Sequence, residues 1–333
     1  MSKKRYIDLH LHLDGAITPA IARRLAAMQG IELPADEAEL EALLSVPADC
    51  KDLNDFLKCF ALPLSLLQTS EALTEAVRLV LDEAYKNGVV YAEIRFAPQL
   101  HTENGMTQEE AVIAAERGLK NSKCNGNLIL CCMRGEGNDD KNFETLEIAK
   151  KRLVKSGGVA AIDLAGAEAL YPTRKYRALF ERAKEYGVPF TIHAGEADGA
   201  ESVRLAIEYG AARIGHGVRS FEDEKVLEML KEKNIPLEMC PTSNRQTHAV
   251  EDMSKYPLKD YLKRGIKVTI NTDDPAIERT TLADEFLYIK KTFGITEDDE
   301  KTLYENSVNA AFTTEKTKKM LLRNTKIKKA KNS

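Results

Sequence analysis

Short apolar runs recur along the whole chain and predict β-strands. Each run is rich in aliphatic residues and is bounded by Gly, Pro, Asp or Asn, which are typical of turns. The eight runs are Tyr6–Leu13, Val89–Ala97, Asn127–Arg134, Val159–Ala165, Pro189–His193, Arg213–His216, Pro236–Met239 and Lys267–Asn271. Eight is the number of strands in a (β/α)₈ barrel.

Most segments between these runs carry apolar residues at helical spacing. Tyr176, Leu179, Phe180 and Ala183, for example, recur at i, i+3, i+4 and i+7, with charged residues at most positions between them. Strands and helices therefore alternate, which favours a parallel sheet. The sequence predicts an α/β fold, a single (β/α)₈ TIM-type barrel that forms one domain over residues 1–333.

The first connection, from Ile17 to Gly88, is too long for one helix and predicts inserted helices. It carries an apolar set at helical spacing, formed by Leu53, Phe56, Leu57 and Phe60. An insertion after the first strand lies on the active-site face of a barrel, because the strands end there. Both a hydrophobic lid over the site and additional core packing fit this pattern.

Composition argues for a small-molecule partner. The 333 residues carry a net charge of -4, so no global positive field attracts nucleic acid or an anionic membrane. The first residues do not resemble a signal peptide and no run has transmembrane length, so we expect a cytoplasmic protein. The lysine-rich stretch from about Lys316 predicts a last amphipathic helix followed by a solvated basic tail.

The six cysteines indicate reduced, mostly buried thiols. They are scattered along the chain and include no C-x-x-C pair. This also excludes the zinc deaminases of the cytidine type, which need H-x-E together with P-C-x-x-C.

Histidines are concentrated where the predicted strands end. His10, His12, His193 and His216 all lie at such positions, whereas His101 and His248 lie in loops and are expected to be structural. The carboxyl ends of barrel strands meet on one face, so these four imidazoles should converge. A lone histidine is more often a hydrogen-bonded core residue, but this distribution favours a functional cluster.

The spacing of these residues predicts a metal site. His10 and His12 alternate along one strand, so both imidazoles point the same way. With His193 and Asp273 they give three imidazoles and one carboxylate, a set that suits one Zn²⁺ per chain with an open position for water. Asp273 and Asp274 should face opposite ways along an extended strand, leaving Asp274 for the substrate.

The chain resembles the adenosine deaminase family of the amidohydrolase superfamily, from about Tyr6 to the C-terminal helix. Eight motifs, specific in this order, carry the resemblance: Asp8-Leu-His-Leu-His-Leu-Asp-Gly-Ala16, Phe56-Leu-Lys-Cys-Phe60, Glu93-Ile-Arg-Phe-Ala-Pro98, Asp163-Leu-Ala-Gly-Ala-Glu168, His193-Ala-Gly-Glu196, Gly215-His-Gly217, Cys240-Pro-Thr-Ser-Asn244 and Asn271-Thr-Asp-Asp-Pro275. The resemblance implies a zinc-dependent hydrolase that deaminates adenosine to inosine, and it implies the same four metal ligands.

The resemblance also implies roles for the other site residues. Glu196 matches the proton donor to purine N1, and His216 matches the residue that orients the attacking water and accepts its proton. Asp274 matches the carboxylate bound to N7, Gly166 the backbone group near N3, and Asp14 the ligand of a ribose hydroxyl. His12 is expected to contact the substrate as well. The family's hydrophobic gate matches Leu53, Phe56, Leu57 and Phe60.

Two positions depart from the family pattern. The family often has His where this chain has Gly135, and Asp where it has Ala167. We expect these differences to alter the ribose contacts and the affinity for the substrate more than the reaction itself. Three alternatives stay open: a deaminase of adenine or AMP, a deaminase of a modified nucleoside, and a silent nucleoside-binding protein. Asp14 favours adenosine, because relatives that act on adenine tend to carry Glu there, and no arginine cluster suits a phosphate.

Overall fold

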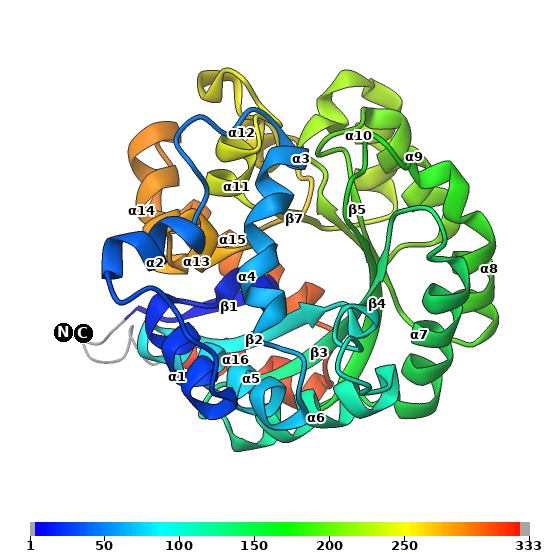
Figure 1. Cartoon of the computed structure of the whole chain (residues 1–333). Coiled ribbons are helices and arrows are strands. Elements are labelled where there is room, and N and C mark those ends of the chain that lie inside the picture. The colour runs from blue at the N-terminus through cyan, green and yellow to red at the C-terminus, as the bar shows by residue number, and fades with distance from the viewer. Residues whose placement is uncertain (1–3, 327–333) are drawn as a thin grey trace.

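Eight parallel strands form a closed barrel with helices around it (Figure 1). The computed structural model describes residues 4–326, so most of the predicted basic tail lies outside the described residues. The strands are β1 (Tyr6–His12), β2 (Val89–Phe96), β3 (Asn125–Met133), β4 (Val159–Ala165), β5 (Thr191–Ala194), β6 (Arg213–His216), β7 (Leu237–Met239) and β8 (Val268–Ile270). The predicted (β/α)₈ architecture is confirmed.

Two seams close the barrel. Within β1–β4 and within β5–β8, neighbouring strands pair in parallel. At the first seam, Ile162 N donates to Pro189 O at 3.0 Å. At the second, Asp273 N donates to His10 O and His12 N donates to Asp273 O, both at 2.8 Å. This second seam places Asp273 between the two histidines of β1.

Helices follow the strands from β2 onward around the barrel. They are α6 (Gln108–Asn121), α7 (Asp139–Arg152), α8 (Arg177–Glu185), α9 (Ala200–Tyr209), α10 (Glu224–Glu232), α11 (Pro241–Gln246), α12 (Leu258–Arg264), α13 (Pro275–Glu278) and α14 (Leu282–Phe293). The predicted stripe Tyr176, Leu179, Phe180 and Ala183 is buried along and just before α8. A capping box between Thr107 and Glu110 begins α6, where it satisfies backbone N–H groups that have no helical partner.

The first connection consists of inserted helices, as predicted. They are α1 (Pro19–Gln29), α2 (Glu37–Leu43), α3 (Leu53–Phe56), α4 (Ala61–Ser65) and α5 (Ser70–Lys86). In Figure 1, α3 and α4 pass in front of the barrel opening. The insertion therefore contributes to the mouth of the barrel as well as to its side.

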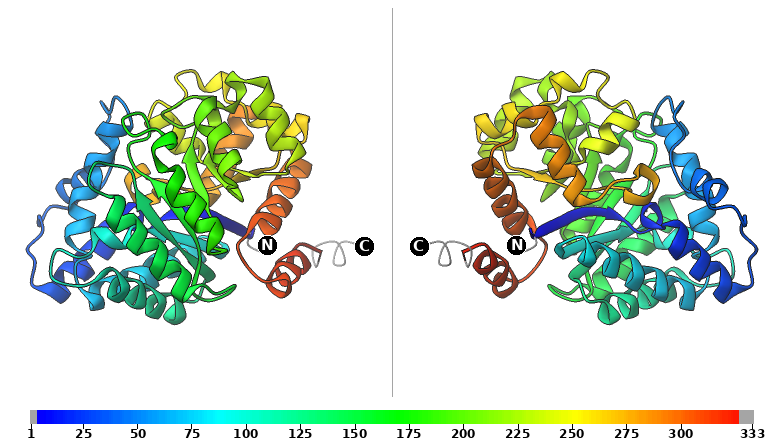
Figure 2. Two further views of the ribbon diagram at one scale, coloured as in Figure 1. Left: turned by 90° about the vertical axis from the view of Figure 1, so that its right-hand side faces the viewer. Right: turned by 90° about the vertical axis from the view of Figure 1, so that its left-hand side faces the viewer.

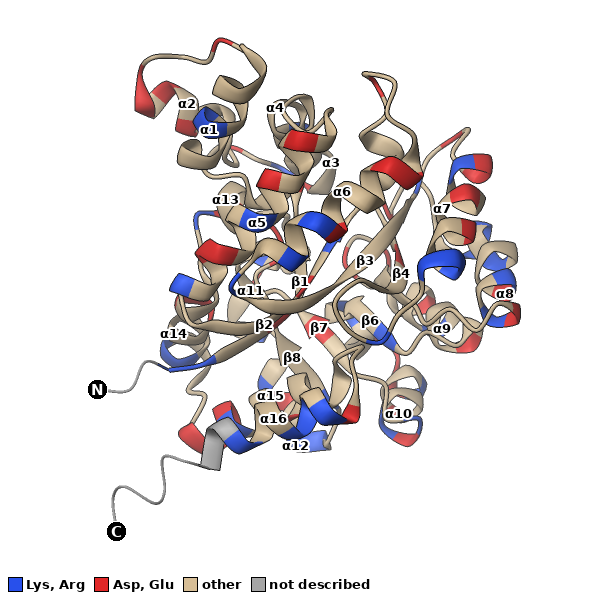
Figure 3. Ribbon diagram, turned by 90° about the horizontal axis from the view of Figure 1, so that it is seen from below, with Lys and Arg blue, Asp and Glu red and all other residues tan. Residues whose placement is uncertain are grey.

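The last two helices lie at the other end of the molecule. In both views of Figure 2, α15 (Glu297–Ala310) and α16 (Glu315–Lys326) are on the side opposite the segment that contains α2 and α3. Acidic and basic positions are interspersed over the outer helices in the view of Figure 3. Among the described residues, no helix is long and apolar enough to cross a bilayer.

Candidate active site

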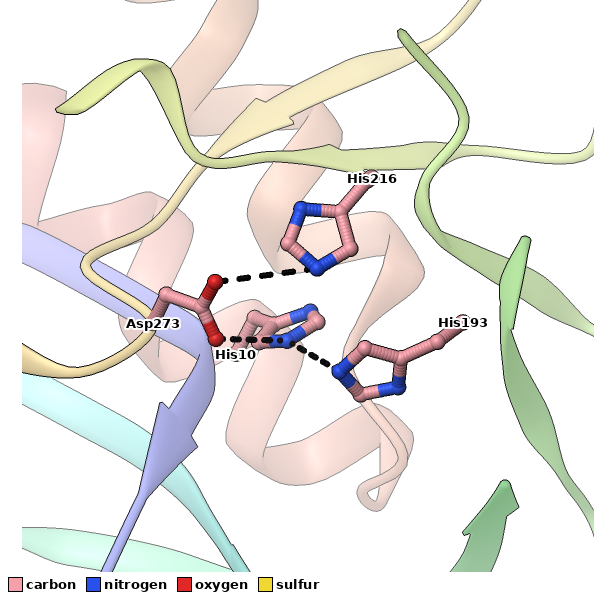
Figure 4. Close-up of side chains that lie close together, drawn as sticks. All are labelled: His10, His193, His216 and Asp273. Carbon is pink, nitrogen blue, oxygen red and sulfur yellow. Dashed lines mark hydrogen bonds and ion pairs between the residues drawn. The ribbon is translucent and has the colours of Figure 1, made fainter. Parts of the chain in front are cut away.

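Three histidines and one aspartate bring their ligand atoms together at the carboxyl ends of the strands. His193 Nε2 lies 3.0 Å from His10 Nε2 and 3.2 Å from His12 Nε2. Asp273 Oδ1 lies 3.1 Å from His10 Nε2 and 3.4 Å from His12 Nε2. Figure 4 shows His10 and His193 from strands β1 and β5 and Asp273 from the turn after β8 pointing toward one another, with His216 beside them.

These separations fit a single tetrahedral metal ion. Nitrogen and oxygen ligands about 2.0–2.1 Å from Zn²⁺ would lie roughly 3.3 Å from one another in a tetrahedron. The four contacts measured span 3.0 to 3.4 Å. These four pairs are compatible with the predicted ligands, and His10, His193 and Asp273 also lie within 4.8 Å of a ring nitrogen of His216, so the assignment of His12 as the fourth ligand stays a prediction.

The other ring nitrogens of two ligands face buried carboxylates. His10 Nδ1 is hydrogen-bonded to Glu238 Oε2 at 2.8 Å, and His193 Nδ1 lies 2.9 Å from Asp163 Oδ2, although at an angle poor for a hydrogen bond. When Nδ1 carries the proton, the Nε2 lone pair is free to bind a metal. The lone pairs of His10 and His193 then face each other at 3.0 Å, an arrangement that a cation between them stabilises.

A buried ionic network supports these carboxylates. Arg95 contacts Asp163 Oδ2 at 2.9 Å and Glu238 Oε2 at 2.8 Å, and Arg213 contacts Glu238 Oε1 at 2.5 Å. Although burial opposes ionisation, Arg95 and Arg213 hold the pKa of Glu238 well below its usual range.

His216 lies on the other side of Asp273. Its Nε2 is 3.6 Å from Asp273 Oδ2 and 3.6 Å from Glu196 Oε2. Its Nδ1 lies 3.1 Å from Asn244 Nδ2, and Asn244 Oδ1 accepts a hydrogen bond from the Tyr256 hydroxyl at 2.9 Å. Asn244 therefore orients the ring so that Nε2 faces Glu196 and Asp273.

Glu196 is buried beside the metal-ligand cluster. Burial, and then the carboxylates of Asp273 and Glu168, raise its pKa well above the usual value for glutamate. Glu168 accepts hydrogen bonds from four consecutive backbone N–H groups, of Gly195, Glu196, Ala197 and Asp198, at 2.7 to 3.0 Å. The loop that carries Glu196 is thus fixed by one buried carboxylate, a function that the sequence analysis did not assign.

The extended geometry predicted for Asp273 and Asp274 is wrong. The strand β8 ends at Ile270, and Asp273 has φ +66°, a left-handed conformation that is uncommon for residues other than glycine. The two side chains consequently do not alternate, and both line the same cavity. His216 also has a positive φ, +57°, so two neighbouring site residues have strained backbones.

A cavity of about 280 Å³ opens above the ligand atoms. The predicted gate residues all line it, as do His12, Asp14, Gly166, Glu196, His216 and Asp274. Of the two departures from the family pattern, Ala167 lines the cavity and Gly135 does not. Gly135 instead donates its backbone N–H to the Tyr176 hydroxyl at 2.9 Å.

His101 and His248 lie outside the cluster, as predicted. His248 Nε2 is hydrogen-bonded to Cys50 O at 3.1 Å, and His101 Nδ1 to Leu67 O at 3.0 Å. All six cysteines are unpaired, and all but Cys59 are buried, so the expected burial is confirmed and their reduced state stays a prediction.

His101 should make stability depend on acid pH. Burial lowers the pKa of His101 from 6.5 to about 4. Between these two pH values the histidine is protonated in the unfolded chain and neutral in the folded chain. The free energy of unfolding should fall by about 3 kcal/mol from this group as pH drops from 6.5 to 4. His101→Asn keeps a donor for Leu67 O. Its free energy of unfolding, measured with urea at a series of pH values, should fall less between pH 6.5 and 4 than that of the wild type. An equal fall in both proteins would contradict this explanation.

Comparisons with known proteins agree with the geometry. The adenosine deaminase family model matches residues 6–328. Adenosine deaminase of Haemophilus ducreyi is 50% identical, with 95% of this chain and 94% of that protein covered, and the enzyme of Clostridium perfringens is 41% identical, with 95% and 96% covered. A solved adenine deaminase of Arthrobacter aurescens has a TM-score of 0.87 at 31% identity and covers 96% of this chain and 98% of that one. Sequence, fold and site together show that this chain belongs to the adenosine deaminase family.

Proposed function

We propose that this chain hydrolyses adenosine and 2′-deoxyadenosine to the corresponding inosine and ammonia, with one Zn²⁺ per chain held by His10, His12, His193 and Asp273. The observation that carries the proposal is the convergence of these four ligands beside a buried Glu196, in a chain of this family. Zinc, when bound, supplies Lewis-acid activation of water, lowering its pKa from about 15.7 to about 7.

Glu196 is the proton donor in this proposal. It gives its proton to purine N1, so that the electron pair displaced when water adds at C6 is localised on N1. Its raised pKa favours the protonated form that this step needs, and Glu168 holds its backbone. The reaction is completed when the proton taken from the attacking water passes to the C6 amino group, the C6–N bond breaks and ammonia leaves.

In this proposal His216 orients the attacking water and accepts its proton at Nε2. Its Nδ1 must therefore carry the ring proton, and the Asn244 amide must turn so that its oxygen accepts from Nδ1–H. The Nε2 of His216 faces the space between Asp273 Oδ2 and Glu196 Oε2, 3.6 Å from each, and Asn244 holds the ring from behind. A base in this place acts on the water while Glu196 acts on the purine ring. The two groups thus divide acid and base catalysis between them.

Unpaired oxygens in the cavity support the substrate contacts. Asp14 Oδ1 and Asp274 Oδ1 are buried and have no hydrogen-bond partner within the described residues. A buried oxygen without a partner is costly, so a contact with the ligand is expected at each. Burial, and then the carboxylate of Asp273, raise the pKa of Asp274, which favours the protonated form that can donate to purine N7. In the proposed complex Asp274 donates to N7, Asp14 accepts from a ribose hydroxyl, His12 contacts the ribose, and the Gly166 backbone lies near N3.

The gate residues close the cavity over the substrate. Leu53, Phe56, Leu57 and Phe60 present an apolar surface to it from α3 and the turn that follows. Such a surface excludes water from the reacting centre once the nucleoside is bound. Both predicted uses of this segment are compatible with the structure, since Phe56 also packs on Cys50 and Ile277.

A substrate panel tests the proposed function. Loss of ultraviolet absorbance at the adenosine band should be fast for adenosine and 2′-deoxyadenosine, and much slower for adenine and AMP. Preferential turnover of adenine would assign the chain to the activity named for the Arthrobacter structure. Zinc binding without turnover of any of the four would indicate another amine substrate or a silent binding protein.

Gly15 should be required for substrate affinity. A Cβ added at Gly15 would lie only 1.7 Å from Asp274 Oδ1 and 2.5 Å from its Cγ, so Gly15→Ala must displace this carboxylate. We expect KM for adenosine to rise about tenfold, the equivalent of about one buried hydrogen bond, with zinc content unchanged. Gly105→Ala is the control for a strained alanine away from the cavity: open space surrounds it but its φ is +87°, so stability should fall while KM stays at the wild-type value. A wild-type KM in Gly15→Ala would remove Asp274 from the substrate contacts.

The remaining expectations about the cell stay predictions. They are a cytoplasmic location and the absence of nucleic-acid and membrane partners.

A further inference from the structure

A column of buried charged side chains leads from the metal site toward the other end of the barrel. His10 Nδ1 is hydrogen-bonded to Glu238 Oε2 at 2.8 Å, and Glu238 Oε1 accepts from Arg213 Nε at 2.5 Å. Arg213 Nη1 is 2.6 Å from Glu93 Oε2. All four side chains are at most 1% exposed, so the contacts form without competition from water.

The column ends on the segment that joins α15 to α16. Phe312 N donates to Glu93 Oε1 at 2.6 Å, and Arg213 Nη1 donates to Ala310 O at 3.0 Å. The Arg213 guanidinium lies 3.9 Å from the centre of the Phe312 ring, and Asn127 Nδ2 donates to Phe312 O at 2.6 Å. These two helices lie at the end of the molecule opposite α2 and α3 (Figure 2).

We propose that Arg213, fixed by Glu93 and by the segment Ala310–Phe312, is a positioning residue for His10 and thereby controls how firmly the site retains its metal. This inference rests on the proposed zinc centre. It assigns a function in metal retention to residues at the end of the barrel that does not contact the substrate.

The argument depends on how Glu238 divides its two oxygens. Oε2 serves His10 and Arg95, whereas Arg213 is the charged partner of Oε1. Without Arg213, Arg95 alone among the arginines holds Glu238, so the carboxylate is less firmly oriented and His10 is bound to a more mobile acceptor. Loss of such outer partners typically lowers metal affinity about 10- to 100-fold.

A contribution to stability alone would give a different result. The buried ion pairs join β2, β6 and β7 to the C-terminal segment, so their loss also lowers Tm. Only a positioning function would accelerate metal loss from protein that is still folded. Rates of metal loss therefore separate the two explanations.

The experiment compares zinc-loaded wild type with Arg213→Lys, Phe312→Ala and Leu303→Ala. Lysine keeps the charge of Arg213 but lacks the planar guanidinium that contacts Glu238 through Nε and Glu93 through Nη1. Phe312→Ala removes the ring over the guanidinium and keeps the backbone contacts. Leu303, fully buried in α15 and outside the column, provides the control for a loss of stability alone. The readout is transfer of zinc to an excess of a coloured chelator, well below the Tm of every variant.

We expect zinc transfer to accelerate about tenfold or more in Arg213→Lys, severalfold in Phe312→Ala, and not at all in Leu303→Ala despite its lower Tm. Equal rates in all four folded proteins, or equal acceleration in Leu303→Ala, would overturn the inference. If Arg213→Lys does not fold, Phe312→Ala decides. The zinc content of the wild-type protein is measured first. Wild type that retains no zinc would overturn the proposed metal centre, whereas wild type that retains zinc, with equal rates in the variants, would overturn only the inference about Arg213.

Discussion

Replacing Glu196 with glutamine is expected to lower kcat for adenosine by about 10²- to 10⁴-fold, the usual contribution of a general acid. An amide fills the same space but cannot give a proton to N1. The metal ligands are unchanged, so bound zinc, measured by atomic absorption, should stay at one per chain. The loop should also keep its shape, because Glu168 binds its backbone and not the Glu196 side chain.

Glu201→Gln is the matched control for this variant. Glu201 allows the same substitution of glutamine for glutamate on the exposed surface of α9, where it pairs with Arg204. It should turn over adenosine as wild type does. Near-normal kcat in Glu196→Gln would exclude Glu196 as the proton donor and leave the proposed division of acid and base without support.

His12→Ala is expected to lose zinc and activity together. Its Nε2 is one of the four converging ligand atoms, and the Ala variant leaves two imidazoles and one carboxylate. We expect zinc affinity to fall by more than about 100-fold, beyond the effect of changes to outer partners. Folding should be preserved, because His12 is the more exposed histidine of β1, with a side chain 13% accessible.

His248→Asn controls for the loss of a histidine in general. His248 lies outside the cluster and has φ +57°, a conformation that asparagine tolerates well. It should retain stoichiometric zinc in equilibrium dialysis. A His12→Ala protein that also held one tightly bound zinc would remove His12 from the ligand set.

The barrel could be predicted because its signals are local and repeated. Val159–Ala165 and Arg213–His216 are strands with the predicted bounds, and the other strands differ by at most two residues at either end. The strand ends differ because the apolar pattern continues past the last hydrogen bond between paired strands, as at Leu13. The histidines could be placed for a similar reason, since parallel strands of a barrel all end on one face.

Features that depend on long-range contacts could not be predicted in the same way. The left-handed turn at Asp273 exists because its backbone pairs with both His10 and His12 across the last seam of the barrel. A strand pattern predicts extended geometry there, so it places Asp274 on the wrong side. Nothing local distinguishes this turn from the end of an ordinary strand.

The outer partners of the ligands were missed for a related reason. Glu238 stands in the short strand Leu237–Met239, and an isolated carboxylate between two buried apolar residues was the only available signal. Its meaning depends on Arg95, Arg213 and His10, which come from three other strands. A charged residue inside a predicted barrel strand therefore indicates a buried partner, but the partner becomes evident only in three dimensions.

The most direct test of the proposed zinc-dependent deamination is a zinc titration of metal-free protein in which the conversion of adenosine to inosine is the readout. We expect activity to rise in proportion to added zinc and to reach a plateau at one zinc per chain. Full activity in the metal-free protein, or no conversion with one zinc bound per chain, would contradict the proposed function.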